Sequence, residues 1–150
     1  LLVAGPSDGY ANVILEKANK NGLSKQLIFT GWIGHEEMRL AYTVADVVLV
    51  PSLYLDAFPR IVIEAMALGR PVVGTCYGGA PEAIEDGITG YVVDPFNTKE
   101  MSERIIDLLE DPEKAEKFGK AGYERVKTAF NLDEKIKNIL ACYHDEFGIK

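Results

Sequence analysis

Short apolar runs separated by polar, helix-forming stretches fill the first two-thirds of the chain. The runs cover residues 1–4, 27–30, 47–50, 72–75 and 91–93, and Gly, Pro or Asp stands beside each of them. An uninterrupted apolar run of this length is typical of a strand that is covered on both faces, as in a parallel sheet. The pattern therefore predicts five buried parallel strands.

The segments between these runs have helical patterns. They predict helices over residues 10–21, 36–45, 59–68 and 81–85. Strands that alternate with helices are the signature of an open α/β sheet with right-handed crossovers. We therefore expect a Rossmann-like parallel sheet with helices on both faces.

Beyond residue 97 the periodicity becomes helical throughout. Apolar side chains recur at helical spacing over residues 101–109 and 132–147, and residues 113–128 predict a further helix. Thr98 and Asn131 precede two of these helices and are expected to cap them. No repeat, low-complexity segment or linker interrupts the pattern, so residues 1–150 are expected to form a single domain with a helical C-terminal end.

Composition and charge exclude several classes of protein. The net charge of −7 has the wrong sign for a nucleic-acid surface or an anionic membrane. The apolar runs are far too short to cross a bilayer, so no membrane insertion by this chain is expected. Two cysteines, Cys76 and Cys142, leave no disulfide framework and suit reduced thiols in a cytoplasmic protein. Because the chain opens directly with a core-like strand, it is expected to be a piece of a larger protein.

The loop after the first strand reads Gly5-Pro6-Ser7-Asp8-Gly9. It is rich in glycine but lacks the Gly-x-Gly-x-x-Gly spacing of a dinucleotide site, and Pro6 removes a backbone donor that a pyrophosphate would use. No P-loop occurs in the sequence either. A dinucleotide fingerprint is therefore absent.

The most informative segment surrounds the third predicted helix. Pro59 suits the first helical position, and from there to Leu68 the helix is apolar on every side except at Glu64. A buried carboxylate is costly unless it is hydrogen-bonded, and the lean of helical side chains places the Glu64 oxygens near the helix N-terminus. Glu64 is thus either a ligand-binding residue or a structural glutamate that backbone amides satisfy.

Arg60 adds a cation to the first turn of that helix, where it opposes the helix dipole unless an anion accompanies it. Either Asp56 or a bound phosphate could be this anion. Asp56 and Glu64 would flank a helix N-terminus, which is a natural phosphate site. Carboxylates beside a phosphate suggest a sugar, because they accept hydrogen bonds from hydroxyl groups.

The order and spacing of several motifs resemble one family over the whole chain. The sequence is similar to the C-terminal half of a retaining glycosyltransferase of the GT-B fold, in the group 1, family 4-like branch. The residues that carry the resemblance are Leu2-Val3-Ala4-Gly5, Ile28-Phe29-Thr30-Gly31-Trp32-Ile33, Ala45-Asp46-Val47 through Val50-Pro51-Ser52, Asp56-x7-Glu64-Ala65, Gly69-x-Pro71-Val72-Val73, Gly78-Gly79-x-Pro81-Glu82 and Asp86-Gly87-x-x-Gly90.

The resemblance implies a site for a nucleotide-activated sugar marked by a Glu-x7-Glu motif. Its second glutamate, matched by Glu64, binds the ribose hydroxyls. Its first, matched by the one-methylene-shorter Asp56, contacts the transferred sugar. Backbone amides near Phe58 and Arg60 are expected to contact the sugar or the diphosphate, whereas Pro59 stands where the family usually has glycine and therefore lacks one donor.

The resemblance also places the nucleobase against the loop Gly31-Trp32-Ile33. Trp32 itself either stacks on the base or is a partly buried loop aromatic. Gly78-Gly79 lets the backbone approach a ligand or a missing domain, unless it is simply a tight turn. No metal is expected in such a site, and His35 and His144 are expected on the surface.

Three parts of the family's machinery have no counterpart in these 150 residues: the Arg and Lys that hold the diphosphate, a catalytic-region histidine and the acceptor domain. The chain is therefore expected to be the donor-binding half of a hexosyltransferase and inactive alone. The acceptor, a glycan or lipid-linked glycan, would bind an N-terminal domain that could also attach the enzyme peripherally to a membrane. The alternatives are a GT-B epimerase or phosphorylase domain, or a non-catalytic nucleotide-binding module.

Overall fold

A computed structural model describes residues 1–6 and 9–148 of the chain. The chain divides into two compact units, Leu1–Val44 and Ala45–Lys150, each of which is described by itself. Ser7 and Asp8, in the glycine-rich loop after the first strand, lie outside the described residues.

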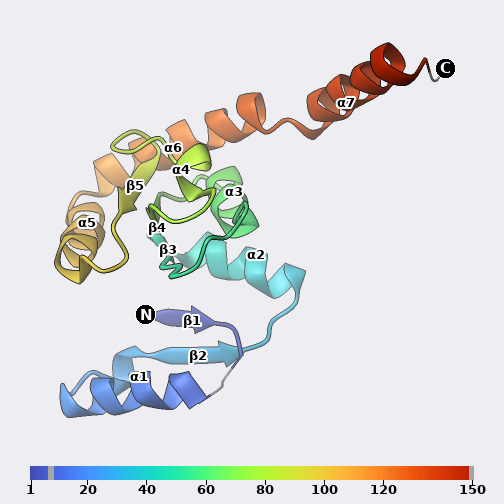
Figure 1. Cartoon of the computed structure of the whole chain (residues 1–150). Coiled ribbons are helices and arrows are strands. Elements are labelled where there is room, and N and C mark those ends of the chain that lie inside the picture. Colours follow the sequence, from blue (N-terminus) through green and yellow to red (C-terminus); the bar gives the residue numbers. More distant parts are fainter. Residues whose placement is uncertain (7–8, 149–150) are drawn as a thin grey trace. The chain divides into compact units, whose positions relative to one another are not determined.

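The first unit is built on a parallel pair of strands (Figure 1). Leu2 pairs with Ile28 and Val3 with Phe29, and an irregularity before Ala4 shifts its partner to Gly31. Its elements are β1 (Leu2–Ala4), α1 (Gly9–Lys20), the 3-10 helix η1 (Ser24–Gln26), β2 (Ile28–Gly31) and α2 (His35–Val44).

The second unit contains a three-stranded parallel sheet in the order β3-β4-β5. Val50 pairs with Gly74, and Val73 pairs with Tyr91, so β4 is the central strand. Its elements are β3 (Val48–Val50), α3 (Arg60–Ala67), β4 (Val72–Thr75), α4 (Ala80–Ala83), β5 (Gly90–Val93), α5 (Thr98–Glu110), α6 (Pro112–Ala129) and α7 (Leu132–Phe147).

The predicted strands and helices are all present, with ends that differ by a few residues at most. The prediction that all five strands are buried is wrong for β1 and β2, where Leu2 is 41% and Ile28 60% exposed, because few side chains of the described residues cover them. Among the described residues the five strands form two separate sheets instead of one.

Asn131 caps α7 as predicted, because its side chain accepts a hydrogen bond from the Glu134 amide. Thr98 is not the cap of α5: Asn97 takes that position and accepts a hydrogen bond from the Glu100 amide, so Thr98 is the first helical residue.

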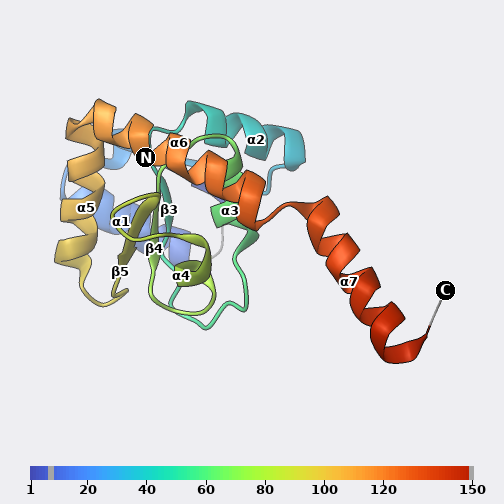
Figure 2. The ribbon, with the colours of Figure 1, turned by 90° about the horizontal axis from the view of Figure 1, so that it is seen from above.

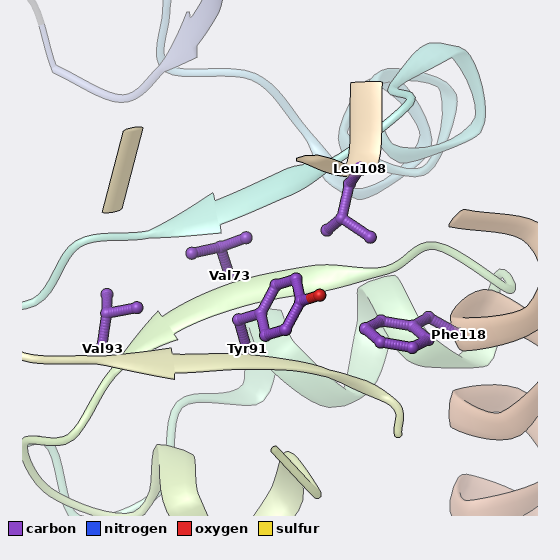
Figure 3. Close-up of a cluster of buried hydrophobic side chains, with 5 residues drawn as sticks. All are labelled: Val73, Tyr91, Val93, Leu108 and Phe118. Atoms are coloured by element: carbon purple, nitrogen blue, oxygen red, sulfur yellow. The ribbon is translucent and has the colours of Figure 1, made fainter. Parts of the chain in front are cut away.

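The core of the second unit lies between its sheet and the helices α5 and α6 (Figure 3). Val73 from β4, Tyr91 and Val93 from β5, Leu108 from α5 and Phe118 from α6 form one buried cluster. The rings of Tyr91 and Phe118 meet edge to face, with 5.3 Å between their centroids. This cluster fixes β4, which pairs with β3 and is followed by the loop that contains Gly78 and Gly79.

A polar network secures the same region at its edge. The Tyr91 hydroxyl donates a hydrogen bond of 2.6 Å to Asp107, which also accepts one of 2.8 Å from Lys114. These hydrogen bonds, first that from Lys114 and then that from Tyr91, hold the pKa of Asp107 below its usual value. Burial, followed by the hydrogen bond to Asp107, raises the pKa of the Tyr91 hydroxyl.

Helix α6 is tied to both short helices of the unit. A Cβ on Gly119 would lie 2.0 Å from the Gly69 carbonyl oxygen, so the backbones of α6 and the end of α3 are in direct contact. Arg125 bonds to the end of α4: its Nε donates to the Ala83 carbonyl at 2.8 Å, Nη2 donates to the Glu82 carbonyl at 2.9 Å, and Nη1 pairs with the Glu85 carboxylate. The guanidinium therefore satisfies carbonyls that a helix end leaves open.

Helix α7 contrasts with these packed helices. All of its residues are exposed, and Figures 1 and 2 show it extending away from the three-stranded sheet. No helix among residues 1–6 and 9–148 is long and apolar enough to cross a membrane. His35 and His144 are exposed as predicted, and Cys76 and Cys142 are free exposed thiols.

Candidate functional site

The candidate site is built on the segment that joins β3 to α3. Pro59 lies at the N-cap position, with φ −72° and ψ 101°, so the helix begins at Arg60 and the prediction of Pro59 as its first residue is off by one. Proline has no side-chain acceptor and makes no capping hydrogen bond. The first turn closes instead through the Val62 amide, which donates to the Pro59 carbonyl at 3.0 Å.

Asp56 is half-buried just before this helix, and its own loop holds its carboxylate. Oδ1 accepts a hydrogen bond of 3.2 Å from the Phe58 amide, two residues further along the chain. This is an Asx-turn, which orients a carboxylate without help from other elements. The Phe58 amide, predicted as a donor to the ligand, is thus engaged by Asp56 in this structure.

The main chain of Asp56 is held from a second loop, the one that follows β4. The Gly79 amide donates a hydrogen bond of 2.8 Å to the Asp56 carbonyl. The side chain of Phe58 packs against Phe130, with 5.6 Å between the ring centroids, and the Arg125 guanidinium lies 5.7 Å from the centroid of Phe130. The segment before α3 is therefore held by residues from two distant parts of the chain.

Arg60 is exposed at the start of α3. Within the described part of the chain no ion pair or hydrogen bond joins it to Asp56. Of the two anions that the sequence allowed beside Arg60, Asp56 is therefore not the one found in this structure. The guanidinium and the first amides of α3 present positive charge at the same helix end.

Glu64 lies in the second turn of α3 and is half-buried. Val62, Ala65 and Met66 on the same helix are completely buried, but Ile61 is 45% exposed. The prediction of burial on every side is therefore wrong, because the sheet and α6 cover only one side of the helix. Glu64 lies on the same short helix as Arg60, so one element carries both side chains.

The remaining predicted residues lie in the first unit, in the loop after β2. Gly31 has φ +69°, a left-handed conformation that glycine adopts without steric cost. Trp32 is 84% exposed, which excludes the partly buried loop aromatic that was one of its two interpretations, whereas Ile33 is half-buried. The structure thus groups Asp56, Phe58, Pro59, Arg60 and Glu64 in the second unit, and Gly31, Trp32 and Ile33 in the first.

The sequence did not point to every residue that supports this site. Phe130 follows Phe58 by more than seventy positions, and no local motif connects the two. Thr75 ends β4 completely buried, and its hydroxyl donates a hydrogen bond of 2.8 Å to the Ser52 carbonyl. The Gly78-Gly79 pair did stand out as a motif, and the residues it contacts could only be identified in the folded chain.

Comparison with known proteins places these residues in context. Residues 1–125 match the model of the family "Glycosyl transferases group 1". An alpha-D-kanosaminyltransferase from Streptomyces kanamyceticus is 36% identical over 145 residues, which are 96% of this chain and 37% of that protein. The curated relatives are longer, and the chain spans about a third of the length of the first four of them.

Solved structures share the fold. Sucrose-phosphate synthase from Thermosynechococcus elongatus superposes with a TM-score of 0.88 and 32% identity, over 99% of this chain and 38% of that one. Anabaena Alr3699/HepE in complex with UDP-glucose superposes with a TM-score of 0.82 over 94% of this chain and 40% of that one, at 22% identity. At that identity the likeness to HepE concerns the fold alone.

Proposed function

The chain belongs to the group 1 glycosyl transferases, and from that premise we propose that it is the nucleotide-sugar-binding part of a longer, retaining glycosyltransferase. Such an enzyme transfers a hexose from a nucleoside-diphosphate sugar to an acceptor in the synthesis of a glycan, glycolipid or polysaccharide. The observation that carries the proposal is the arrangement at α3, where Asp56 precedes the helix start and Glu64 lies in its second turn.

Different residues around the start of α3 bind different parts of the nucleotide sugar. Glu64 accepts hydrogen bonds from the ribose hydroxyls, and Asp56 accepts them from the transferred sugar. The diphosphate lies at the helix N-terminus, beside the exposed Arg60. Because Pro59 has no N–H and the Phe58 amide donates to Asp56, the first free amides of α3 are those of the helical residues themselves.

The loop Gly31-Trp32-Ile33 holds the nucleobase, and the exposed ring of Trp32 is available to stack on it. HepE, which has the same fold, holds UDP-glucose, and this supports a nucleoside-diphosphate sugar as the ligand. We propose that the donor binds without a metal cofactor. We propose that the whole protein is cytoplasmic and that its acceptor binds an N-terminal domain. The same domain could attach the protein peripherally to a membrane.

Calorimetry on the full-length enzyme tests these roles. Glu64→Gln should weaken binding of both the nucleoside diphosphate and the nucleotide sugar by about 1–3 kcal/mol, the range of a charge-assisted hydrogen bond. Asp56→Asn should weaken binding of the nucleotide sugar and leave the bare nucleotide nearly unchanged. Glu113→Gln, an exposed carboxylate on α6, is the matched control. Unchanged affinity in Glu64→Gln, or equal losses of both ligands in Asp56→Asn, would contradict the assignments.

The charges of the chain predict that residues 1–150 alone bind the donor weakly. Arg60 and Arg70 are the cations between residues 40 and 97, and Arg70 lines a surface pocket at the far end of α3 with Glu116 and Lys120. One cation and one helix N-terminus do not neutralise a diphosphate. We expect affinity no tighter than roughly millimolar, about −4 kcal/mol. Micromolar binding in a titration of this chain would show that its own loops suffice.

A further inference from the structure

Two consecutive glycines follow β4, and both face the segment that carries Asp56. A Cβ built on Gly78 would lie 2.0 Å from the carbonyl oxygen of Asp56 and 2.7 Å from its nitrogen. A Cβ on Gly79 would lie 2.3 Å from the Ala57 carbonyl oxygen. Both contacts are with backbone, which cannot move aside as a flexible side chain can. No residue other than glycine fits at either position without displacing the segment.

The same segment is tied at one end to β4 and at the other end to the loop that follows β4. The Thr75 hydroxyl bonds to the Ser52 carbonyl near its start, and the Gly79 amide bonds to the Asp56 carbonyl at 2.8 Å near its end. Between these points the chain has no regular secondary structure. The position of the Asp56 main chain is therefore set by the backbone of the loop after β4.

The position of the Asp56 main chain in turn determines where its carboxylate lies. Asp has a short side chain, and Oδ1 is already held by the Phe58 amide within the same segment. A displacement of the Asp56 carbonyl by an added methyl group would carry the carboxylate with it. Glu64 should keep its position, because its helix is packed through the buried side chains of Val62, Ala65 and Met66 and not through this segment.

We infer that Gly78 and Gly79 are positioning residues of the donor site, which hold the Asp56 main chain where its carboxylate can reach the transferred sugar. The inference rests on the proposed function for the role of Asp56. The sequence allowed two interpretations of the glycine pair, close approach of a ligand or a missing domain, and a simple tight turn. The structure shows instead that both glycines contact the protein's own backbone. Glycine at position 78 is further required by its φ of +66°.

The chain supplies two matched controls for a test in the full-length enzyme. Gly87 has φ +72° but nothing within 4 Å of an added Cβ, so Gly87→Ala reproduces the backbone strain of Gly78→Ala without the clash. A Cβ on Gly119 would lie 2.0 Å from the Gly69 carbonyl, so Gly119→Ala reproduces the clash in a different part of the same unit. Gly79 has an ordinary φ of −84°, so Gly79→Ala tests the steric clash without added backbone strain.

Three quantities should be measured for each variant: the affinity for the nucleotide sugar, the affinity for the bare nucleoside diphosphate, and amide hydrogen exchange in residues 52–58. Gly78→Ala and Gly79→Ala should lower nucleotide-sugar affinity by about tenfold or more, since small misplacements of a binding group have effects on this scale. Affinity for the bare nucleotide should stay within about twofold of the wild type. Exchange in residues 52–58 should become faster, and neither control should show this combination.

Two results would overturn the positioning role. One is unchanged exchange and affinity in Gly79→Ala, and the other is an equal loss of both ligands that Gly119→Ala reproduces. If exchange becomes faster while Asp56→Asn and both glycine variants bind the nucleotide sugar normally, the glycines do position Asp56 and the proposed sugar-binding role of Asp56 is wrong. Should Gly78→Ala fail to fold, Gly79→Ala decides between these outcomes.

Discussion

The two sheets of this chain have similar apolar sequences and very different degrees of burial. Val72 and Val73 in β4 are completely buried, whereas Leu2 in β1 is 41% exposed and Ile28 in β2 is 60% exposed. Helices α3 to α6 all contact the three-stranded sheet. A short apolar run thus predicts a strand reliably, but the depth at which the strand is buried depends on what packs against it.

The loops that follow the strands show the same contrast. In the first unit Trp32 is 84% exposed beyond β2. In the second unit the segment beyond β3 is held by Thr75, Gly79 and Phe130. The second unit therefore carries its candidate ligand-binding residues on a fixed support, and its stability and its binding should respond to the same substitutions.

Replacement of one deeply buried side chain should separate the two units most strongly. Leu108 is 1% exposed, so Leu108→Ala should lower the free energy of unfolding of the second unit by about 2–5 kcal/mol. Ile28→Ala, at a largely exposed position in the first unit, should change the free energy of unfolding of that unit by no more than about 0.5 kcal/mol. Urea unfolding gives the size of each effect, and amide hydrogen exchange localises it. Equal loss of protection in β1 and β4 for Leu108→Ala would show that the two units unfold together.

Trp32 should contribute to binding without contributing to stability. Because its ring packs on little of the protein, Trp32→Ala should leave the urea midpoint unchanged. Loss of stacking on a nucleobase should weaken nucleotide binding by about 1–3 kcal/mol. Calorimetry with the full-length enzyme measures the second effect. A lower urea midpoint with unaltered affinity would reverse the assignment.

Phe58, unlike Trp32, should contribute to both stability and binding. Phe58→Leu removes the ring contact with Phe130 and should cost about 0.5–1.5 kcal/mol of stability beyond the loss of buried area. It should also weaken nucleotide-sugar binding, because the segment before α3 loses one of its supports. Trp32→Leu, an aromatic-to-leucine change in the other unit, is the control for stability only, because Trp32 is itself proposed to bind the nucleobase. If both variants unfold at the wild-type urea concentration, the Phe58–Phe130 contact contributes no stability.

The smallest expected effect is a pH dependence confined to the second unit. The pKa of Asp107 is lowered in the folded chain, chiefly by the hydrogen bond from Lys114. As the pH falls, Asp107 therefore binds a proton at a higher pH in the unfolded chain than in the folded chain. The stabilisation is therefore present above about pH 4 and is lost as the pH falls through the lower folded pKa. Asp107→Asn should remove this component, which we expect to be below about 1 kcal/mol for a partly exposed pair. Urea midpoints for both proteins at pH 6 and pH 3 measure it, and parallel shifts would exclude Asp107 as the source.

The sequence predicted what depends on neighbours along the chain. The apolar runs located every strand, and Asn131 was identified as a cap because capping requires only a nearby amide. The error at Thr98 has the same local origin, since two adjacent residues, Asn97 and Thr98, can both cap and only the backbone decides between them. Pro59 was misplaced by one residue for a similar reason.

What could not be predicted depends on residues that meet only after folding. The exposure of Ile61 follows from the elements that cover α3 on one side only. The candidate site was located from the order of motifs, yet the support that Gly79 gives to Asp56 involves a residue more than twenty positions away. The engagement of the Phe58 amide by Asp56 is local, but it is visible only once the loop has a conformation.

The contacts of Arg125 have a consequence for the time at which this region can form during synthesis. Helix α4 has four residues, too few to persist alone, and the guanidinium that caps it lies 42 positions after Ala83. A ribosome adds roughly 5–20 residues per second, so Arg125 is synthesised about 2–8 s after the end of α4. Phe130, the partner of Phe58, is added later still. The loops of the candidate site are therefore translated early and completed late, and until then they are exposed to chaperones and proteases.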